Sequence, residues 1–225
     1  MDAASLSPQK ANANKPQKLS ANVTSGDNLR FRSTFYTAIG RILLAEMSDL
    51  YDKFDQFFLP IHKRFVQIKA AFQELLTAAA GNPQVLQTPL AVRVKLAVIA
   101  LSRDLRGLAL AFPTRDPYRL LFETIHPEYT ELIARALEVW RDDARVCVPV
   151  LRLFCELAQN RSQRIQADAH SPIPYLLFRD ISKVFCTFVS HLLTLNPTAA
   201  AKSNPNDQSL FDLKYVSSLP PLVVQ

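Results

Sequence analysis

Apolar residues recur every three to four positions between about residues 29 and 195, which is the period of an amphipathic helix. The first predicted helix carries an apolar stripe made of Phe31, Phe35, Ile39, Ile42, Leu43 and Met47. The second carries a longer stripe, made of Leu50, Phe54, Phe57, Phe58, Ile61, Phe65, Ile68, Phe72, Leu75 and Leu76. No stretch alternates in the manner of a strand, so the pattern predicts an all-α chain of six to eight helices.

Local signals place the ends of these helices. Ser48 is a suitable N-cap for the second helix, and Pro60 should kink or split that helix near Phe58, because proline removes a backbone hydrogen bond. The segment "GNPQ" at 81–84 is predicted to be a loop. Thr88 and Pro89 then supply a cap and a first-turn proline for the next helix.

The second half of the chain continues in the same way. Further helices are predicted at about residues 89–112, 116–126, 127–140, 150–157 and from "SPIP" (171–174) onward. The segment "RDDARVCVP" (141–149) is predicted to be a turn. The apolar face of the last helix is predicted to contain Phe178, Ile181, Phe185, Phe188 and Leu192.

Short connections between these helices favour antiparallel neighbours. Successive helix pairs follow one another every 40–50 residues or so, which is typical of HEAT-like helical hairpins stacked as a short α-solenoid. A closed helical bundle is the alternative that periodicity alone leaves open. Residues 28–195 are predicted to form the helical repeat domain. Residues 1–27 and 196–225 are polar and rich in Ala, Asn, Ser, Lys and Pro, so they are expected to be mostly disordered tails.

Composition narrows the functional classes. The chain of 225 residues has only 4 glycines and neither glycine-rich phosphate-binding motif. Its net charge of +6 is spread along helical faces without interleaved aromatic residues, so no specific nucleic-acid surface is expected. The N-terminus has no apolar signal segment, and no uncharged apolar run approaches 18 residues, so membrane insertion is not expected.

No set of residues suggests an enzyme, a metal site or a cofactor. The three cysteines, Cys147, Cys155 and Cys186, lie in apolar stretches without the spacing of a disulfide or zinc motif, and are expected to be buried. The histidines show no metal-binding pair at i, i+4. The pair Asp142–Asp143 is most simply a helix cap.

Two arginine-containing segments are the candidate binding elements. In "SRDLRG" (102–107), Arg103 and Arg106 could bind a partner, or Asp104 could pair with an arginine of the adjacent hairpin. Gly107 costs about 1 kcal/mol within a helix, which suggests a close neighbouring helix, a local distortion or a functional reason. In "NRSQR" (160–164), Arg161 and Arg164 could hold a partner's carboxylates, or they could complement the end of the preceding helix dipole.

Several longer blocks resemble a known family in one consistent order. They are "FRSTFYTAIGRIL", "YDKFDQFFLPI", "LSRDLRGLALAF", "LFETIHPEY", "ARALEVW", "PVLRLFCELAQNRSQRIQ" and "LLFRDISK". Together they look like the middle portion of the exportin-7 and Ran-binding-protein 16/17 group of the importin-β (karyopherin-β) superfamily. The similarity covers about residues 29–195. The segment around 65–94 and both tails resemble the family less.

The resemblance implies a HEAT-repeat receptor that carries cargo proteins through the nuclear pore, in contact with pore proteins and under the control of Ran-GTP. The receptor would shuttle between nucleus and cytoplasm. Family members are several times longer and grip Ran chiefly through amino-terminal repeats that this sequence lacks. We therefore expect an internal piece, either a truncated gene model or a diverged short form. The alternative is a free-standing helical scaffold that binds a protein partner without Ran control.

Overall fold

The computed structural model describes residues 26–45, 50–166 and 171–194. These residues form seven α-helices and two short 3-10 helices, with no strand among them. The elements are α1 (Gly26–Ala45), α2 (Leu50–Gly81), η3 (Pro83–Gln87), α3 (Pro89–Ala111), α4 (Arg115–Ile125), α5 (Glu128–Val139), α6 (Ala144–Ala158), η4 (Arg161–Gln163) and α7 (Ile173–Thr194). The predicted all-α class and helix number are confirmed.

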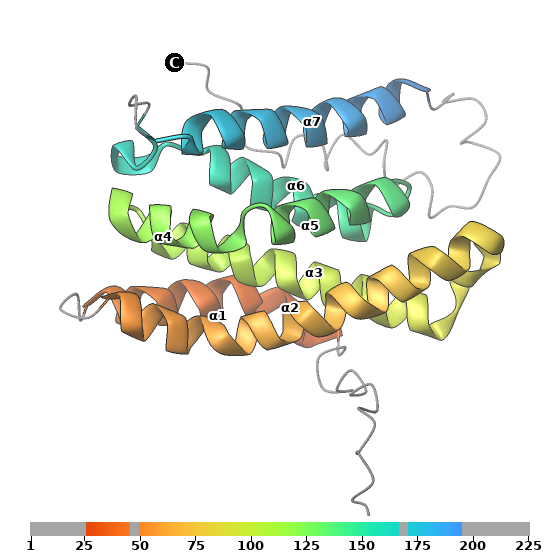
Figure 1. Cartoon of the computed structure of the whole chain (residues 1–225), viewed down its shortest axis with the longest axis horizontal. Helices are drawn as coiled ribbons and strands as arrows, with labels where there is room; N and C mark the ends of the chain where they lie inside the picture. Colours follow the sequence, from red (N-terminus) through yellow and green to blue (C-terminus); the bar gives the residue numbers. More distant parts are fainter. Residues whose placement is uncertain (1–25, 46–49, 167–170, 195–225) are drawn as a thin grey trace, which may run out of the picture.

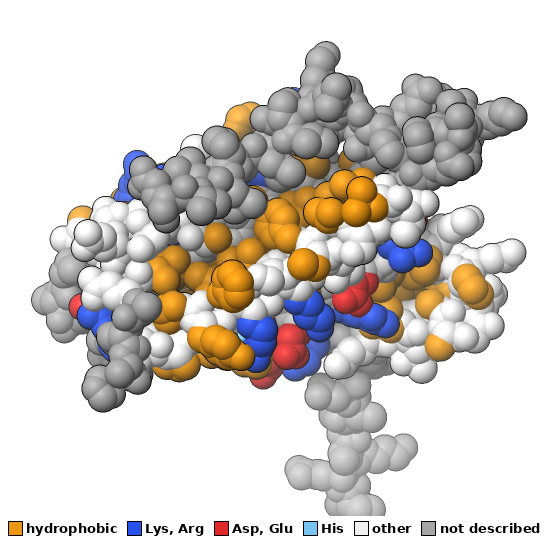
Figure 2. All heavy atoms as spheres, turned by 90° about the horizontal axis from the view of Figure 1, so that it is seen from above, with side chains coloured by type: hydrophobic (Ala, Val, Ile, Leu, Met, Phe, Trp, Pro, Cys, Tyr) orange, Lys and Arg blue, Asp and Glu red, His pale blue; other side chains and the backbone are white. Residues whose placement is uncertain are grey.

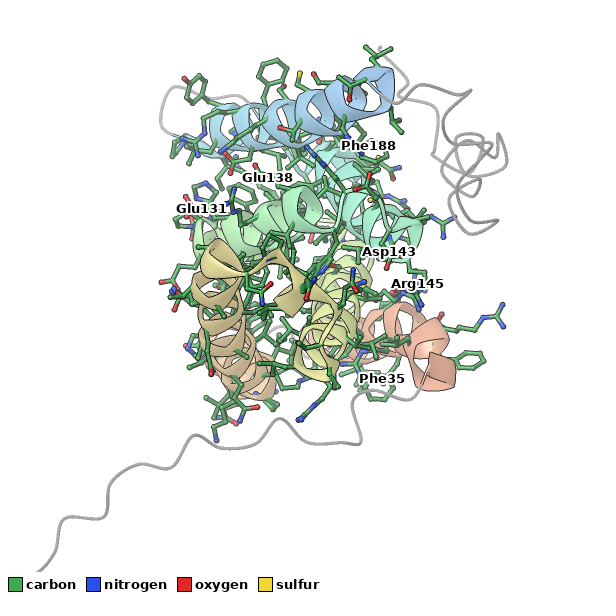
Figure 3. The ribbon with its side chains drawn as sticks, turned by 90° about the vertical axis from the view of Figure 1, so that its right-hand side faces the viewer. Phe35, Glu131, Glu138, Asp143, Arg145 and Phe188 are labelled. Atoms are coloured by element: carbon green, nitrogen blue, oxygen red, sulfur yellow. The ribbon has the colours of Figure 1, made fainter. Side chains whose placement is uncertain are left out.

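The helices stack in two columns. In Figure 3, α2 and α5 lie on one side, and α1, α3 and α6 lie on the other. Helix α3 packs against α1 and α6 within its own column and against its hairpin partner α2. Helices α5 and α6 form the next hairpin, and α7 packs on both of them at the top of the stack (Figure 1). This arrangement is the predicted HEAT-like solenoid and not a closed bundle.

The contact between α1 and α3 is the closest in the stack and depends on two glycines. A Cβ atom on Gly107 would lie 2.5 Å from the carbonyl oxygen of Ser33, and one on Gly40 would lie 2.6 Å from Cβ of Ala111. The hydroxyl of Thr37 donates a hydrogen bond to the carbonyl oxygen of Gly107 at 3.0 Å. The predicted close neighbour of Gly107 is therefore helix α1.

The predicted start of α3 is confirmed. The side chain of Thr88 accepts a hydrogen bond from the amide of Ala91, and Pro89 occupies the first turn. The helix ends at Ala111, immediately before Phe112 and Pro113. The loop predicted at 81–84 is only partly correct, because α2 includes Gly81 and a 3-10 helix begins at Pro83.

Two predictions near prolines need correction. Helix α2 is continuous from Leu50 to Gly81, so the predicted split at Pro60 is wrong. Phe58 and Ile61 are buried on either side of that proline, and their packing offsets the hydrogen bond that it removes. Similarly, α6 begins at Ala144 and includes Pro149, so "RDDARVCVP" is mostly helical.

The start of α6 is set by a local cap. The carboxylate of Asp143 accepts a hydrogen bond from the amide of Arg145 at 3.0 Å and also binds the ammonium of Lys95 at 2.9 Å. The prediction that this acidic pair caps a helix is confirmed for Asp143. Its neighbour Asp142 instead lies 2.7 Å from Nε2 of His191, which ties α7 to the α5–α6 turn.

Several predictions fall outside the described residues. They concern the cap at Ser48, the end of the first stripe at Met47 and nearly all of the tails at 1–27 and 196–225. The domain limits thus stay a prediction. Among the helices that the structure describes, none is sufficiently long and apolar to span a membrane.

The two ends of the stack expose parts of their apolar stripes. On α1, Phe31, Phe35 and Ile42 are exposed. On α7, Phe178 is 73% exposed, whereas Phe188 is buried. Figure 2 shows hydrophobic side chains gathered on the α7 end, and Figure 3 places Phe35 and Phe188 toward opposite ends of the stack.

We expect the isolated chain to associate with itself, because exposed apolar stripes of this kind leave water when copies pack together. Replacing Tyr175, Phe178 and Leu193 of α7 by serine should shift its sedimentation profile toward the monomer. Replacing the exposed polar residues Thr187 and Ser190 by alanine should leave the profile unchanged. A sharp monomeric boundary for the unaltered chain at about 50 µM would contradict this expectation.

Candidate partner-binding surface

Arg103 and Arg106 lie on the outer strip of α3, between α1 and α6. The two residues are three positions apart on the helix and therefore share a face. Both side chains are half-buried, whereas the residues around them are buried, namely Ser102, Asp104, Leu105 and Gly107. Arg103 and Arg106 are thus the half-buried positions of a segment of α3 that is otherwise buried.

The structure surrounds these two residues with further arginines. Burial lowers the pKa of the Arg103 guanidinium, and the charges of Arg152 on α6 and Arg30 on α1 lower it further. Burial also lowers the pKa of Arg106, where Glu156 acts in the opposite direction, and Arg152 and Arg161 add to the decrease. We call Arg30, Arg103, Arg106, Arg152 and Arg161 the arginine row.

The negative charge that faces the arginine row is already engaged. Oε1 of Glu156, a buried carboxylate, lies 3.1 Å from Nε of Arg161 and 3.6 Å from Nη2 of Arg164. Nε of Arg106 is buried and makes no hydrogen bond within the described part of the chain. The positive groups of the arginine row therefore outnumber the carboxylates beside them.

Arg161 remains a candidate residue for contact with a protein partner. Its side chain is 45% exposed, and its guanidinium donates hydrogen bonds to the side chains of Gln159 and Glu156. A partner carboxylate could approach its exposed edge without breaking the pair with Glu156.

Arg164 does not belong to the surface that the sequence suggested. Its side chain is 0% exposed, and its guanidinium lies 4.3 Å from the centre of the Tyr118 ring. It donates hydrogen bonds to the carbonyl oxygens of Ala109 (2.5 Å), Phe112 (3.0 Å), Gln159 (2.9 Å) and Glu156 (2.6 Å). These carbonyls end α3 and α6, so the alternative role at a helix terminus is confirmed and extended to two helices.

The turn before Arg164 positions this side chain. Helix α6 ends at Ala158, and Ser162 and Gln163 both have positive φ angles (48° and 56°). The side chain of Asn160 accepts a hydrogen bond from the amide of Ile165 at 2.7 Å and closes the turn. Left-handed geometry at two non-glycine residues is costly, and the buried contacts of Arg164 offset that cost.

Asp104 holds the inner side of α3 to α1 and α2. Its carboxylate, 1% exposed, accepts hydrogen bonds from Nε and Nη2 of Arg32 and lies 3.3 Å from Nη1 of Arg64. Burial raises the pKa of the Asp104 carboxyl, and the hydrogen bond and charge of Arg32 act against that rise. The predicted pairing of Asp104 with an arginine of a neighbouring helix is confirmed.

Replacing Asp104 by asparagine should lower the free energy of unfolding by about 2 kcal/mol, because two arginines lose their buried counter-charge. Thermal unfolding followed by circular dichroism would measure the change. Asp55→Asn on the exposed side of α2 is the control and should change little. Equal stability of the two variants would contradict a role for Asp104 in joining the helices.

The cysteines and histidines serve structural contacts. Burial raises the pKa of the Cys147 thiol to about 12, with further increases from Asp143 and Asp142, so it stays protonated at neutral pH. Cys155 is also buried, but the predicted burial of Cys186 was wrong, since it is exposed. Nδ1 of His62 lies 2.8 Å from the hydroxyl of Tyr129. No cluster of three metal-binding side chains occurs among the described residues.

Comparison with known proteins identifies the family of this stack. Exportin-7-B of Xenopus laevis is 38% identical over 168 residues, which cover 75% of this chain and 14% of the frog protein. Ran-binding protein 17 of Mus musculus is 37% identical over 187 residues, covering 83% of this chain and 16% of the mouse protein. The chain belongs to the exportin-7 and Ran-binding protein 16/17 group. Ran-binding protein 16 of Drosophila melanogaster is 33% identical over 171 residues, covering 76% of this chain and 15% of the fly protein.

This exportin-7-like chain spans only about one-seventh of the length of these relatives. No family model matches it, and no solved structure matches it. The relatives bear the names of exportins and Ran-binding proteins. Sequence reasoning missed Arg30 and Arg152, because only the packing of α1 and α6 on α3 brings them beside Arg103 and Arg106.

Proposed function

We propose that this chain acts as a repeat segment of a nuclear export receptor, in Ran-dependent transport of cargo proteins through the nuclear pore. The observation that carries the proposal is the 38% identity to an exportin-7 over 168 residues. That length corresponds to three-quarters of the chain, comparable in extent to its helical stack. The protein would shuttle between nucleus and cytoplasm and contact pore proteins during passage.

The mechanism would be differential binding and not catalysis. In a stack of hairpins, each repeat contacts chiefly its neighbours, so small rotations between hairpins add up to a change of curvature. A ligand that favours one curvature then changes the affinity for a second ligand bound elsewhere on the stack. Ran-GTP would supply the first ligand and cargo the second.

The short length of the segment indicates which of the receptor's binding functions it would carry. A chain that spans about one-seventh of its relatives offers a small share of their surface. We therefore propose that the main Ran-binding surface lies outside this segment. The segment itself would help to bind cargo or would pass a change of curvature from one part of the receptor to another. The arginine row is the candidate contact surface, through Arg161, Arg103 and Arg106.

An exchange of segments tests this proposal in a purified system. The 168 matched residues of frog exportin-7-B would be replaced by the corresponding residues of this chain, and cargo affinity would be measured with Ran-GTP and Ran-GDP. We expect the chimera to retain a cargo affinity at least ten-fold higher with Ran-GTP. The control is the frog protein with the matched segment deleted, which should lose this difference.

Two results would contradict the proposal. A folded chimera that binds no cargo in either nucleotide state would show that the segment does not serve this role. Full Ran-dependent binding by the deletion control would show that the segment is not required. Equal cargo binding with Ran-GTP and Ran-GDP would instead favour the alternative, a helical scaffold without Ran control.

A further inference from the structure

The outer face of the α1–α3–α6 column concentrates positive charge that the fold itself does not need. The arginine row draws its members from three consecutive helices of one column and from η4. Four of its five members lie on helices that pack directly on one another, and the fifth, Arg161, lies on the turn that follows α6. The hydroxyl of Ser33 on α1 donates a hydrogen bond to the carbonyl oxygen of Arg103 at 2.9 Å, so Arg30, one turn before Ser33, lies on the side of α1 that faces Arg103. Like charges brought near one another in this way repel, so the row is costly unless an anionic ligand approaches it.

Other arginines of the chain differ from the arginine row because they are paired with carboxylates. Arg32 and Arg64 share the carboxylate of Asp104, and Arg145 pairs with Asp143 at 3.0 Å. In the arginine row, Arg161 has Glu156, whereas Nε of Arg106 is buried without a hydrogen-bond acceptor among the described residues. Glu156 is shared by Arg161 and Arg164, so the row has more positive groups than carboxylates beside it.

We propose that the arginine row binds an extended acidic segment of a protein partner, rich in Asp and Glu. This inference rests on the proposal that the chain binds protein partners, but not on transport or on Ran.

The length of the arginine row determines how long a ligand must be to cross it. Neighbouring helices pack with axes about 8–10 Å apart, so a row that crosses α1, α3 and α6 spans about 20 Å. An extended chain covers about 3.3–3.6 Å per residue, so about six residues are needed to cross it. Carboxylates on alternate residues would lie about 7 Å apart on one side of such a segment. A single phosphate or a free carboxylate would fill only a part of the row.

The chemistry of the row favours a carboxylate ligand over a nucleic acid. Guanidinium groups bind carboxylates through paired, parallel hydrogen bonds. Binding of single-stranded nucleic acid typically adds aromatic side chains on which bases stack. The exposed rings of α1, Phe31 and Phe35, line a separate hollow with Pro60 and Arg64 on the α2 side.

The experiment uses the full chain and a labelled twelve-residue peptide in which glutamate and serine alternate. Fluorescence anisotropy at about 0.1 M salt would follow its binding. We expect the peptide to bind at least ten-fold more tightly than a matched glutamine–serine peptide. We also expect it to bind more tightly than a twelve-nucleotide oligo-dT. Higher salt should weaken the binding, since the contacts are ionic.

Matched variants localise the binding. The triple variant Arg103→Gln, Arg106→Gln, Arg152→Gln should weaken peptide binding at least ten-fold. The control triple Arg119→Gln, Arg135→Gln, Arg179→Gln removes the same charge from α4, α5 and α7 and should weaken it less than two-fold. Lysine at the three row positions keeps the charge and the flexible stem but loses the paired geometry, so it should give an intermediate affinity.

Three results would overturn the proposal. They are equal weakening by the two glutamine triples, tighter binding of oligo-dT than of the acidic peptide, and equal affinity for the glutamate and glutamine peptides. Circular dichroism would verify that each variant is folded. If the glutamine triple fails to fold, the lysine triple and the single variant Arg152→Gln decide the outcome. Because Ran is absent from this assay, its failure would leave the export proposal unaffected.

Discussion

Replacing Arg164 by alanine is expected to lower the free energy of unfolding by about 3–5 kcal/mol, the largest effect of any single arginine substitution in the chain. The substitution removes the guanidinium donor from the carbonyl oxygens of Ala109, Phe112, Gln159 and Glu156 at the ends of two helices. Each buried group that loses its partner costs about 1–3 kcal/mol. The buried carboxylate of Glu156 also loses a neighbouring positive charge.

Thermal and urea unfolding followed by circular dichroism would measure this effect, with a decrease of about 10 °C in the unfolding temperature. Arg161→Ala is the matched control, three residues away in the same segment. Because Arg161 is 45% exposed, its loss should cost at most about 1 kcal/mol. Arg164→Lys should recover little stability, since one ammonium cannot reach four carbonyls. An equal loss of stability on replacing Arg161 and Arg164 would contradict the role of buried Arg164 in joining the ends of α3 and α6.

Replacing Gly107 by alanine is expected to destabilise the chain by about 3 kcal/mol, despite the higher helix propensity of alanine. The new methyl carbon would lie 2.5 Å from the carbonyl oxygen of Ser33 and 2.8 Å from Cβ of Tyr36. The first of these is a backbone atom of α1 and cannot rotate away. Helix α1 would have to move outward from α3, which weakens the closest contact of the stack.

Gly81→Ala is the control for this prediction, because nothing lies within 4 Å of its added carbon. That variant should be neutral or slightly more stable. Gly40→Ala should resemble Gly107→Ala, with a contact of 2.6 Å to Cβ of Ala111. Denaturant titration of the three variants side by side would give the free energies. A Gly107→Ala protein as stable as Gly81→Ala would show that α1 does not pack so closely on α3.

The sequence was sufficient to predict the helices, because each buried face repeats at the helical period. It did not show which of these apolar faces are covered, since Phe31 on α1 and Phe178 on α7 are apolar and yet exposed. Periodicity shows that a face is apolar but not which element covers it. The predicted split at Pro60 is absent because the packing of the surrounding helix outweighs the lost hydrogen bond, and Pro149 likewise lies inside a helix.

The candidate surface was predictable only in part. Arg161 and Arg164 look alike in "NRSQR", but two left-handed residues turn only Arg164 inward. The pairing of Arg32 with Asp104 joins positions 72 residues apart, and a single sequence contains no signal for the partner. The grouping of Arg30 and Arg152 with Arg103 likewise depends on how α1 and α6 pack on α3.

Transport itself tests the central claim most directly. Cells that lack their own exportin-7 would receive the chimera in which this chain replaces the 168 matched residues of frog exportin-7-B, and the nuclear-to-cytoplasmic ratio of a cargo of the frog protein would be measured. We predict that the chimera restores most of the export seen with the unaltered frog protein, whereas the segment deletion restores none. A chimera that is stable and enters the nucleus but leaves the cargo there would contradict the assignment of this chain to nuclear export.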